Sequence, residues 1–183
     1  MPFILIKAQD NTILKNEVNL CVVQLFGGNF RLGYEYMINN KYSVTSYGSF
    51  IMYSDDVYET MGGSIEAQFR FYSVPKSNNW MKLYFTPYFM YKYLDEHDKQ
   101  LNLITNKSMI YRSNFYHIYS SGVMTGMKFK IQANFIVDIS LGGGIRMTKN
   151  PQSSTIIHTD NGIFSIDYSG ITPRANLSLG YMF

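Results

Sequence analysis

Charged side chains recur at alternate positions within apolar and aromatic stretches of this sequence. The candidates for chemistry are Arg31, Glu35, Glu66, Arg70, Lys128, Asp138, Arg146 and Arg174, each flanked on both sides by uncharged residues. Charges removed from bulk water need partners, so these groups could form a compensated ion-pair network. The alternative is that they line a narrow conduit or a ligand-triggered gate. Because basic residues outnumber acidic ones, some cations should face water or the surface.

The sequence gives little evidence for a catalytic site. His117 and Ser121 share one face of a strand, as in some lipid-modifying hydrolases, but four residues separate them by ~13 Å, too far for a direct hydrogen bond. The cluster Asp95–Asp98 could attract a divalent cation, although such a cluster in a loop is more often solvated. No phosphate loop, nucleophile elbow or paired metal ligands occur. We therefore predict no enzyme and assign no catalytic residue, cofactor or metal ligand.

The alternation that places these charges predicts β-strands. Gly, Asn and Pro clusters divide the chain into segments of about the length, ~9 to 11 residues, with which a tilted strand crosses a bilayer. The eight predicted strands are 17–26, 29–38, 42–53, 58–72, 81–93, 117–131, 135–148 and 172–183. The first and third alternate poorly, so bulges are expected at 21–23 and 47–50.

The faces opposite the charges are apolar or aromatic. In the six strands with a clear register, the outward positions include Leu32, Phe85 and Leu141 and carry no charge. Charged residues make up only 16% of the chain, against about 25% in soluble domains. A Lys or Arg in mid-bilayer costs ~2 to 4 kcal/mol, so this segregation indicates lipid outside and a polar lumen inside. The predicted fold is an all-β, antiparallel, up-and-down transmembrane barrel of eight strands.

Small and aromatic residues complete the lumen. Tyr84 and Tyr88 point inward, and an eight-stranded barrel is just wide enough for its own side chains. Inward glycines are expected to make room for guanidinium groups, at Gly62, Gly122, Gly126, Gly142, Gly144 and Gly180. Other aromatic residues fall near strand ends, where bilayer interfaces favour them.

Connections alternate between short and long. The long ones, Asp95–Tyr116 and Lys149–Ile171, open to one side, and both termini lie on the other, since the strand number is even. We expect residues 1–9 to include the remnant of a secretory signal, with an ordinary N-terminus as the alternative, and 10–183 to form one barrel domain. No run of apolar residues is long enough for a transmembrane helix, and the scattered net charge of +3 argues against nucleic acid.

Two stretches carry a family resemblance. The first is 17–50, with Phe26-Gly-Gly-Asn-Phe-Arg-Leu-Gly-Tyr-Glu-Tyr36 and Asn40-Lys-Tyr-Ser-Val44; the second is 176–183. The first resembles the opening hairpin of a family of small outer-membrane barrels of unknown function, common in Bacteroidetes-type bacteria. The second resembles the aromatic-terminated last strand that outer-membrane barrels present to their assembly machinery, here Leu177, Leu179, Tyr181 and Phe183. The resemblance covers about a quarter of the chain and implies a Gram-negative outer membrane, insertion by the barrel-assembly machinery and no assigned activity.

Two functional readings follow. The first is a non-enzymatic integral outer-membrane protein with its lumen plugged by charged side chains, acting as a structural barrel, a surface-binding module or an accessory subunit of a larger envelope complex. The second is a soluble lipocalin-like carrier in which the apolar face lines a cavity. Period two alone is compatible with both, but a water-facing surface with so few charges would be poorly solvated, which favours the first.

Overall fold

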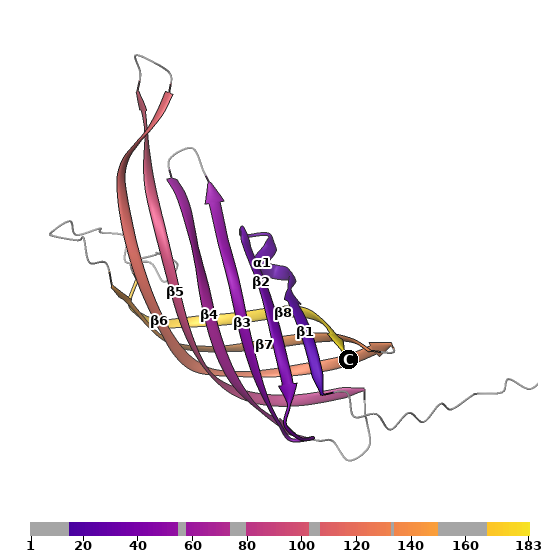
Figure 1. Ribbon diagram of the computed structural model, residues 1–183. Coiled ribbons are helices and arrows are strands. Elements are labelled where there is room, and N and C mark those ends of the chain that lie inside the picture. Colours follow the sequence, from indigo (N-terminus) through magenta and orange to yellow (C-terminus); the bar gives the residue numbers. More distant parts are fainter. Residues whose placement is uncertain (1–14, 55–57, 74–79, 103–106, 133, 150–167) are drawn as a thin grey trace, which may run out of the picture.

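Eight antiparallel strands close into a barrel in the computed structural model, which describes residues 15–54, 58–73, 80–102, 107–132, 134–149 and 168–183 (Figure 1). The strands are β1 (Asn16–Cys21), β2 (Asn29–Met37), β3 (Tyr42–Ser54), β4 (Tyr58–Ser73), β5 (Met81–Asn102), β6 (Lys107–Gln132), β7 (Phe135–Lys149) and β8 (Gly170–Met182). Each strand pairs with its neighbour in sequence, and β1 also pairs with β8. The predicted eight-stranded up-and-down barrel is thus confirmed.

The seam between the first and last strands is closed by backbone hydrogen bonds. Leu20 lies opposite Leu179 and Val18 opposite Tyr181. Beyond this ladder, the Phe183 N–H donates to the Asn16 carbonyl at 2.9 Å, and the Asn16 N–H donates to the Phe183 carbonyl at 3.2 Å. Closure leaves no unpaired edge at this level of the sheet, the condition that a sheet must meet in hydrocarbon.

The outer surface is apolar, as the alternation predicts. Every position assigned outward is exposed or half-buried, and none is buried. Leu32 is 43% exposed, Phe85 48% and Leu141 61%. The buried side chains include charged ones, among them Arg70, Glu35 and Asp138, each 0% exposed. The molecule therefore has the reverse of a soluble core, with polar groups inside and apolar groups outside.

The first strand is shorter than predicted. It ends at Cys21 instead of Phe26, and Val22–Leu25 forms the short helix α1, the one helix within the described residues and too short to cross a membrane. The N–H of Gly27 donates to the Gln24 carbonyl, and that of Gly28 to the Leu25 carbonyl. Gly28 then takes a positive φ of 69°, which a residue without Cβ adopts readily. This local turn chemistry, rather than a bulge at 21–23, explains the poor alternation there.

The bulge predicted at 47–50 is also wrong. The register of β3 with both β2 and β4 is continuous through these residues, with Tyr47 opposite Gly33 and Glu66. The register shifts instead at Asp98/Lys99 between β5 and β6 and at Lys130/Gln132 between β6 and β7.

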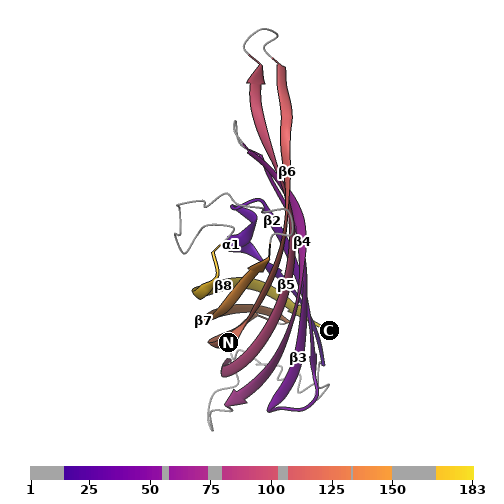
Figure 2. The same cartoon turned by 90° about the vertical axis from the view of Figure 1, so that its left-hand side faces the viewer.

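Strands β5 and β6 extend far beyond the rim. The long loop predicted at Asp95–Tyr116 is instead mostly a continuation of these two strands, which pair as far as Asn102 and Lys107. Figures 1 and 2 show this hairpin rising above the other strands, at the end of the barrel away from the C-terminus. Outside a bilayer the outward positions need not be apolar, so the alternation on which the prediction rested disappears although backbone pairing continues. Most of the second predicted loop, 150–167, lies outside the described residues.

Candidate functional site in the lumen

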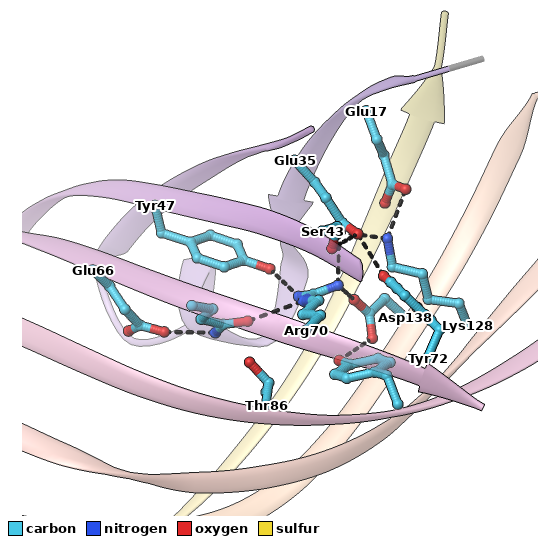
Figure 3. Close-up of polar contacts among 12 residues, drawn as sticks. Glu17, Glu35, Ser43, Tyr47, Glu66, Arg70, Tyr72, Thr86, Lys128 and Asp138 are labelled. Carbon is cyan, nitrogen blue, oxygen red and sulfur yellow. Dashed lines mark hydrogen bonds and ion pairs between the residues drawn. The ribbon is translucent and has the colours of Figure 1, made fainter. Parts of the chain in front are cut away.

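A cluster of buried charges crosses the middle of the lumen. We call Glu17, Glu35, Arg70, Lys128 and Asp138 the central network; they come from β1, β2, β4, β6 and β7 (Figure 3). The Arg70 Nη1 donates to Glu35 Oε2 at 2.8 Å and to Asp138 Oδ2 at 2.7 Å. The Lys128 Nζ donates to Glu17 Oε2 and Glu35 Oε2, both at 2.6 Å. Glu35 therefore receives both cations.

Neutral side chains satisfy most of the remaining groups of this network, whereas Glu17 Oε1 is buried without a hydrogen-bond partner among the described residues. The Tyr47 hydroxyl accepts a bond from Arg70 Nη2 at 2.7 Å, and the Gln68 Oε1 accepts one from Arg70 Nε at 3.1 Å. The Tyr84 hydroxyl donates to Asp138 Oδ1 at 2.6 Å. Glu35 Oε1 accepts bonds from the hydroxyls of Ser43 and Tyr72. Charge-assisted hydrogen bonds of this kind are stronger than neutral ones. We call the network a brace because it connects side chains from opposite walls of the barrel.

A second ion-paired group lies next to the central network, on the side toward α1. Glu66 pairs with Arg31, whose Nη2 is 2.9 Å from Glu66 Oε2, and with Arg174 through the same oxygen. Gln68 joins the two groups, because its Nε2 donates to Glu66 Oε1 at 2.7 Å while its Oε1 accepts from Arg70. Two rings support the guanidinium groups: Arg31 Cζ lies 4.2 Å from the centre of the Tyr47 ring, and Arg174 Cζ 4.5 Å from that of Tyr88.

The structure thus places the eight predicted lumen residues together. Seven of them belong to the two ion-paired groups, and Arg146 lines a cavity beside Arg31 and Arg174. Tyr84 and Tyr88 are buried, as expected. Glu17, Tyr47 and Tyr72 were missed. Glu17 shares the inward face of β1 with Asn19 and Cys21, a weak period-two signal in a short strand, and the bulge expected around Tyr47 obscured its face.

Two cavities flank the central network. The cationic cavity, about 280 Å³, lies toward α1 and is lined by Gln24, Asn29, Arg31, Ser64, Tyr88, Met90, Lys92, Ile118, Ser120, Arg146, Thr172, Pro173 and Arg174. The terminal cavity, about 220 Å³, lies toward the chain ends and is lined by Glu17, Met37, Tyr72, Trp80, Lys82, Lys128, Lys130, Ile136 and Met182. No central-network residue lines the cationic cavity, whereas Glu17 and Lys128 form part of the terminal one.

Inward glycines make room for aromatic rings instead of guanidinium groups. A Cβ added at Gly126 would lie 2.4 Å from Cζ of Tyr84, and one at Gly33 would lie 2.3 Å from Cε1 of Tyr47. At Gly62, Gly122 and Gly142 the nearest atoms belong to the backbone of the adjacent strand. The prediction for these glycines is therefore wrong in its detail: they allow close approach of a ring, of a neighbouring strand or, at Gly180, of the Asn19 and Glu17 side chains.

The other candidates are not assembled into a site. His117 Nδ1 is 2.9 Å from the hydroxyl of Tyr91, and Ser121 faces outward. His97 Nε2 lies 3.5 Å from Asp95 Oδ2, whereas the side chain of Asp98 lies outside the described residues. Across the described part of the chain, no three His, Cys, Asp or Glu side chains are placed to hold a metal.

The last strand presents its aromatic residues to the outside. Leu179, Tyr181 and Phe183 are about half exposed, and Leu177 is partly exposed. The ring of Tyr181 packs edge-on against that of Phe135, at 5.3 Å between centroids. Their role as an assembly signal stays a prediction.

Comparisons with known proteins find only distant likenesses. No protein-family model and no curated protein matches the chain. Among solved structures, the chain is similar to the N-terminal β-barrel domain of Pseudomonas aeruginosa OprF (13% identity, TM-score 0.49, covering 93% of this chain and 98% of that one). It is also similar to Ail, the attachment invasion locus protein of Yersinia pestis (15%, 0.45, 92% and 98%), and to Neisserial surface protein A (12%, 0.43, 92% and 95%). No family is assigned, and the Bacteroidetes-type family stays a prediction.

Proposed function

We propose that this chain is an integral outer-membrane barrel protein without enzymatic activity, with its lumen closed by the central network. The observation that carries the proposal is a closed barrel whose assigned outward positions hold no charge while Arg70, Glu35 and Asp138 are fully buried inside. In hydrocarbon, every backbone group must be paired within the protein, and a closed barrel is the β-structure that achieves this.

The surface composition favours lipid over water. Large apolar side chains of Phe85, Phe89, Ile65 and Leu141 are between 48% and 67% exposed. A soluble monomer rarely exposes a contiguous apolar patch of more than a few hundred Å². The lipocalin-like alternative requires the apolar face to line a cavity, but here that face is outside, so the alternative is not favoured.

The lumen supports closure rather than conduction. Arg70 and Glu35 are completely buried where side chains from five strands meet. Tyr47 and Tyr72 bond to Arg70 and Glu35, and the ring of Tyr84 lies 4.5 Å from Arg70 Cζ. An ion that passed would have to break several charge-assisted bonds at once. The central network thus acts as a structural brace.

The protruding β5–β6 hairpin favours a surface-binding role. Strand β4 accompanies β5 only to the pair Tyr58–Asp98, and β7 accompanies β6 only to the pair Lys149–His117. Within the described residues, no strand pairs with the other edge of β6 over 107–116. Unpaired strand edges are templates for an added strand, so this edge is where we expect a protein partner, including a larger envelope complex.

Lipid contact can be tested with site-specific probes. In a Cys21→Ser background, a spin label at Leu141 or Phe85 should show high accessibility to oxygen and low accessibility to a water-soluble nickel chelate. A label at Lys149, at the rim, serves as the matched control and should show the reverse. An aqueous setting at both Leu141 and Phe85 would refute the proposal.

Assembly and partners need separate tests. Deleting Phe183 should slow insertion by the barrel-assembly machinery while leaving detergent refolding nearly unchanged, because the seam hydrogen bonds of Phe183 are only two. Equal insertion rates for both forms would contradict the assembly-signal role.

A pull-down in a gentle detergent, with and without residues 99–110, tests whether the hairpin tip recruits the partner. Retention of the same partner by the shortened protein would contradict that assignment.

A further inference from the structure

We propose that the cationic cavity is a binding site for a small oxyanion of the phosphate class. This inference goes beyond the barrel's membrane role, because a brace needs compensated charges, whereas Arg31, Lys92 and Arg174 have one carboxylate, Glu66, between them among the described residues. Arg31, Lys92, Arg146 and Arg174 line it, and among the lining residues that the structure describes none is acidic.

One carboxylate, Glu66, pairs with two of these cations. Glu66 Oε2 faces both Arg31 and Arg174, and Glu66 Oε1 is used by Gln68. For Lys92, no ion-pair partner exists among the described residues, although the side chain belongs to the same cavity. Like charges gathered in a site of low dielectric repel one another strongly, so an anion bound among them would be stabilised by all of them.

Several donors in this cavity are buried without an acceptor. Arg31 is 3% exposed, and within the described part of the chain its Nε and Nη2 make no hydrogen bond, although Nη2 is in ion-pair range of Glu66. The Nη1 of Arg174 is likewise buried without an acceptor there. Leaving such a charged donor unsatisfied is costly, and an oxyanion supplies the missing acceptors.

The guanidinium groups are held ready for a ligand. Arg31 lies over the ring of Tyr47 and Arg174 over that of Tyr88, so both guanidinium groups have a supporting contact before any anion arrives. Ser64, Ser120 and Asn29 add neutral hydrogen-bonding groups to the same walls. Guanidinium forks match the oxygen spacing of phosphate and bind it in bidentate fashion. The cavity of about 280 Å³ holds far more than one water, which needs roughly 10 to 15 Å³.

Access is from the end that carries α1 and the long hairpin. Gln24 of α1 and Asn29 at the start of β2 form part of the walls, and their side chains are bonded to each other at 3.1 Å. Gln24, Lys92, Arg146 and Arg174 each retain partial exposure, so solvent reaches the cavity. Outer-membrane barrels present their longer loops to the exterior, so under the proposed function this end faces the cell exterior. The ligand would be a soluble phosphate or phosphate monoester rather than a lipid, whose acyl chains the lumen cannot hold.

The experiment titrates inorganic phosphate into the refolded barrel in an uncharged detergent, with sodium chloride adjusted to constant ionic strength. Calorimetry should show saturable one-site binding, and the ¹⁵N-labelled Arg31 and Arg174 Nε–H signals should shift with the same midpoint. Lys92→Gln should weaken binding about tenfold or more, since it removes one charged donor. Lys130→Gln, which removes the same charge at the exposed mouth of the terminal cavity, is the matched control and should bind as the parent does.

Three outcomes would overturn the site: no saturable binding above the chloride background, equal weakening by Lys92→Gln and Lys130→Gln, or arginine signals that do not move. Because the arginine signals are read on the unmodified chain, the test does not depend on a variant folding. Heat-modifiable migration on an unboiled gel is recorded for every sample, so failure of the site is distinguished from failure of the barrel.

Discussion

The central network and the cationic cavity are built from the same residue types in one lumen, yet their charges are arranged differently. In the central network, two cations face three carboxylates, and tyrosine hydroxyls complete the bonds. In the cationic cavity, Arg31 and Arg174 share Glu66, and Lys92 has no ion pair among the described residues. Burial is tolerated in the first because each charged group there has a partner of opposite charge. The second keeps open donors, and that difference separates a structural brace from a place suited to a ligand.

The largest effect should come from removing the centre of the brace. Arg70→Leu leaves Glu35 with one cation and Asp138 with none of its described ion pairs, and should lower the free energy of unfolding by about 3 to 5 kcal/mol. The measurement is a urea titration in detergent or lipid, followed by the gel shift between folded and unfolded bands. Lys130→Leu is the control for loss of a lysine at the rim. If both variants unfold at the parent's urea concentration, the network is not a brace.

A smaller effect is expected where a glycine faces a ring of the brace. Gly126→Ala places a Cβ within 2.4 Å of Tyr84 and should lower stability by about 1 to 3 kcal/mol. Gly48→Ala is the control, because a Cβ there meets no atom within 4 Å. Measured against the matching Tyr84 single variant, adding Gly126→Ala should cost as much in Tyr84→Phe, where the ring remains, and less in Tyr84→Ala, where the Ile139 carbonyl at 2.8 Å is the close contact left. An equal added loss in both backgrounds would contradict the ring-contact explanation.

Removing a charge from the cationic cavity should not lower the free energy of unfolding, in contrast to Arg70→Leu. Without phosphate, Lys92→Gln reduces repulsion and breaks no described ion pair, so stability should be unchanged or rise by less than about 1 kcal/mol. Urea titrations at fixed ionic strength, with and without phosphate, measure this directly. Phosphate should stabilise the parent more than the variant, following mass action. A destabilisation as large as that of Arg70→Leu would show that both regions are braces.

The smallest effect concerns conduction. In planar bilayers the parent protein should give no sustained current, because we propose that the central network closes the lumen. Tyr84→Ala, which removes one ring but no charge, should add at most brief, small openings. Sustained currents from the unmodified protein would show that the lumen is not closed.

Much of the fold could be predicted because it depends on local alternation. The outward faces of six strands follow from period two, and the structure confirms them. The extension of β5 and β6 beyond Tyr93 could not be predicted in the same way, because polar strands in water do not need alternation. Likewise, Val22–Leu25 turns into α1 through hydrogen bonds onto Gly27 and Gly28 that no hydrophobic pattern records.

The sequence by itself determined which residues face inward, because neighbouring side chains on a strand point to opposite faces whatever the strand pairs with. Only the tertiary structure decided which of them meet. Arg70 reaches Asp138, 68 residues away, and Lys128 reaches Glu17, 111 residues away, across strands that are not neighbours in the sheet. Those contacts exist because the sheet closes on itself and brings opposite walls within side-chain reach, and closure also leaves Arg31 and Lys92 beside Arg174 with too few carboxylates between them.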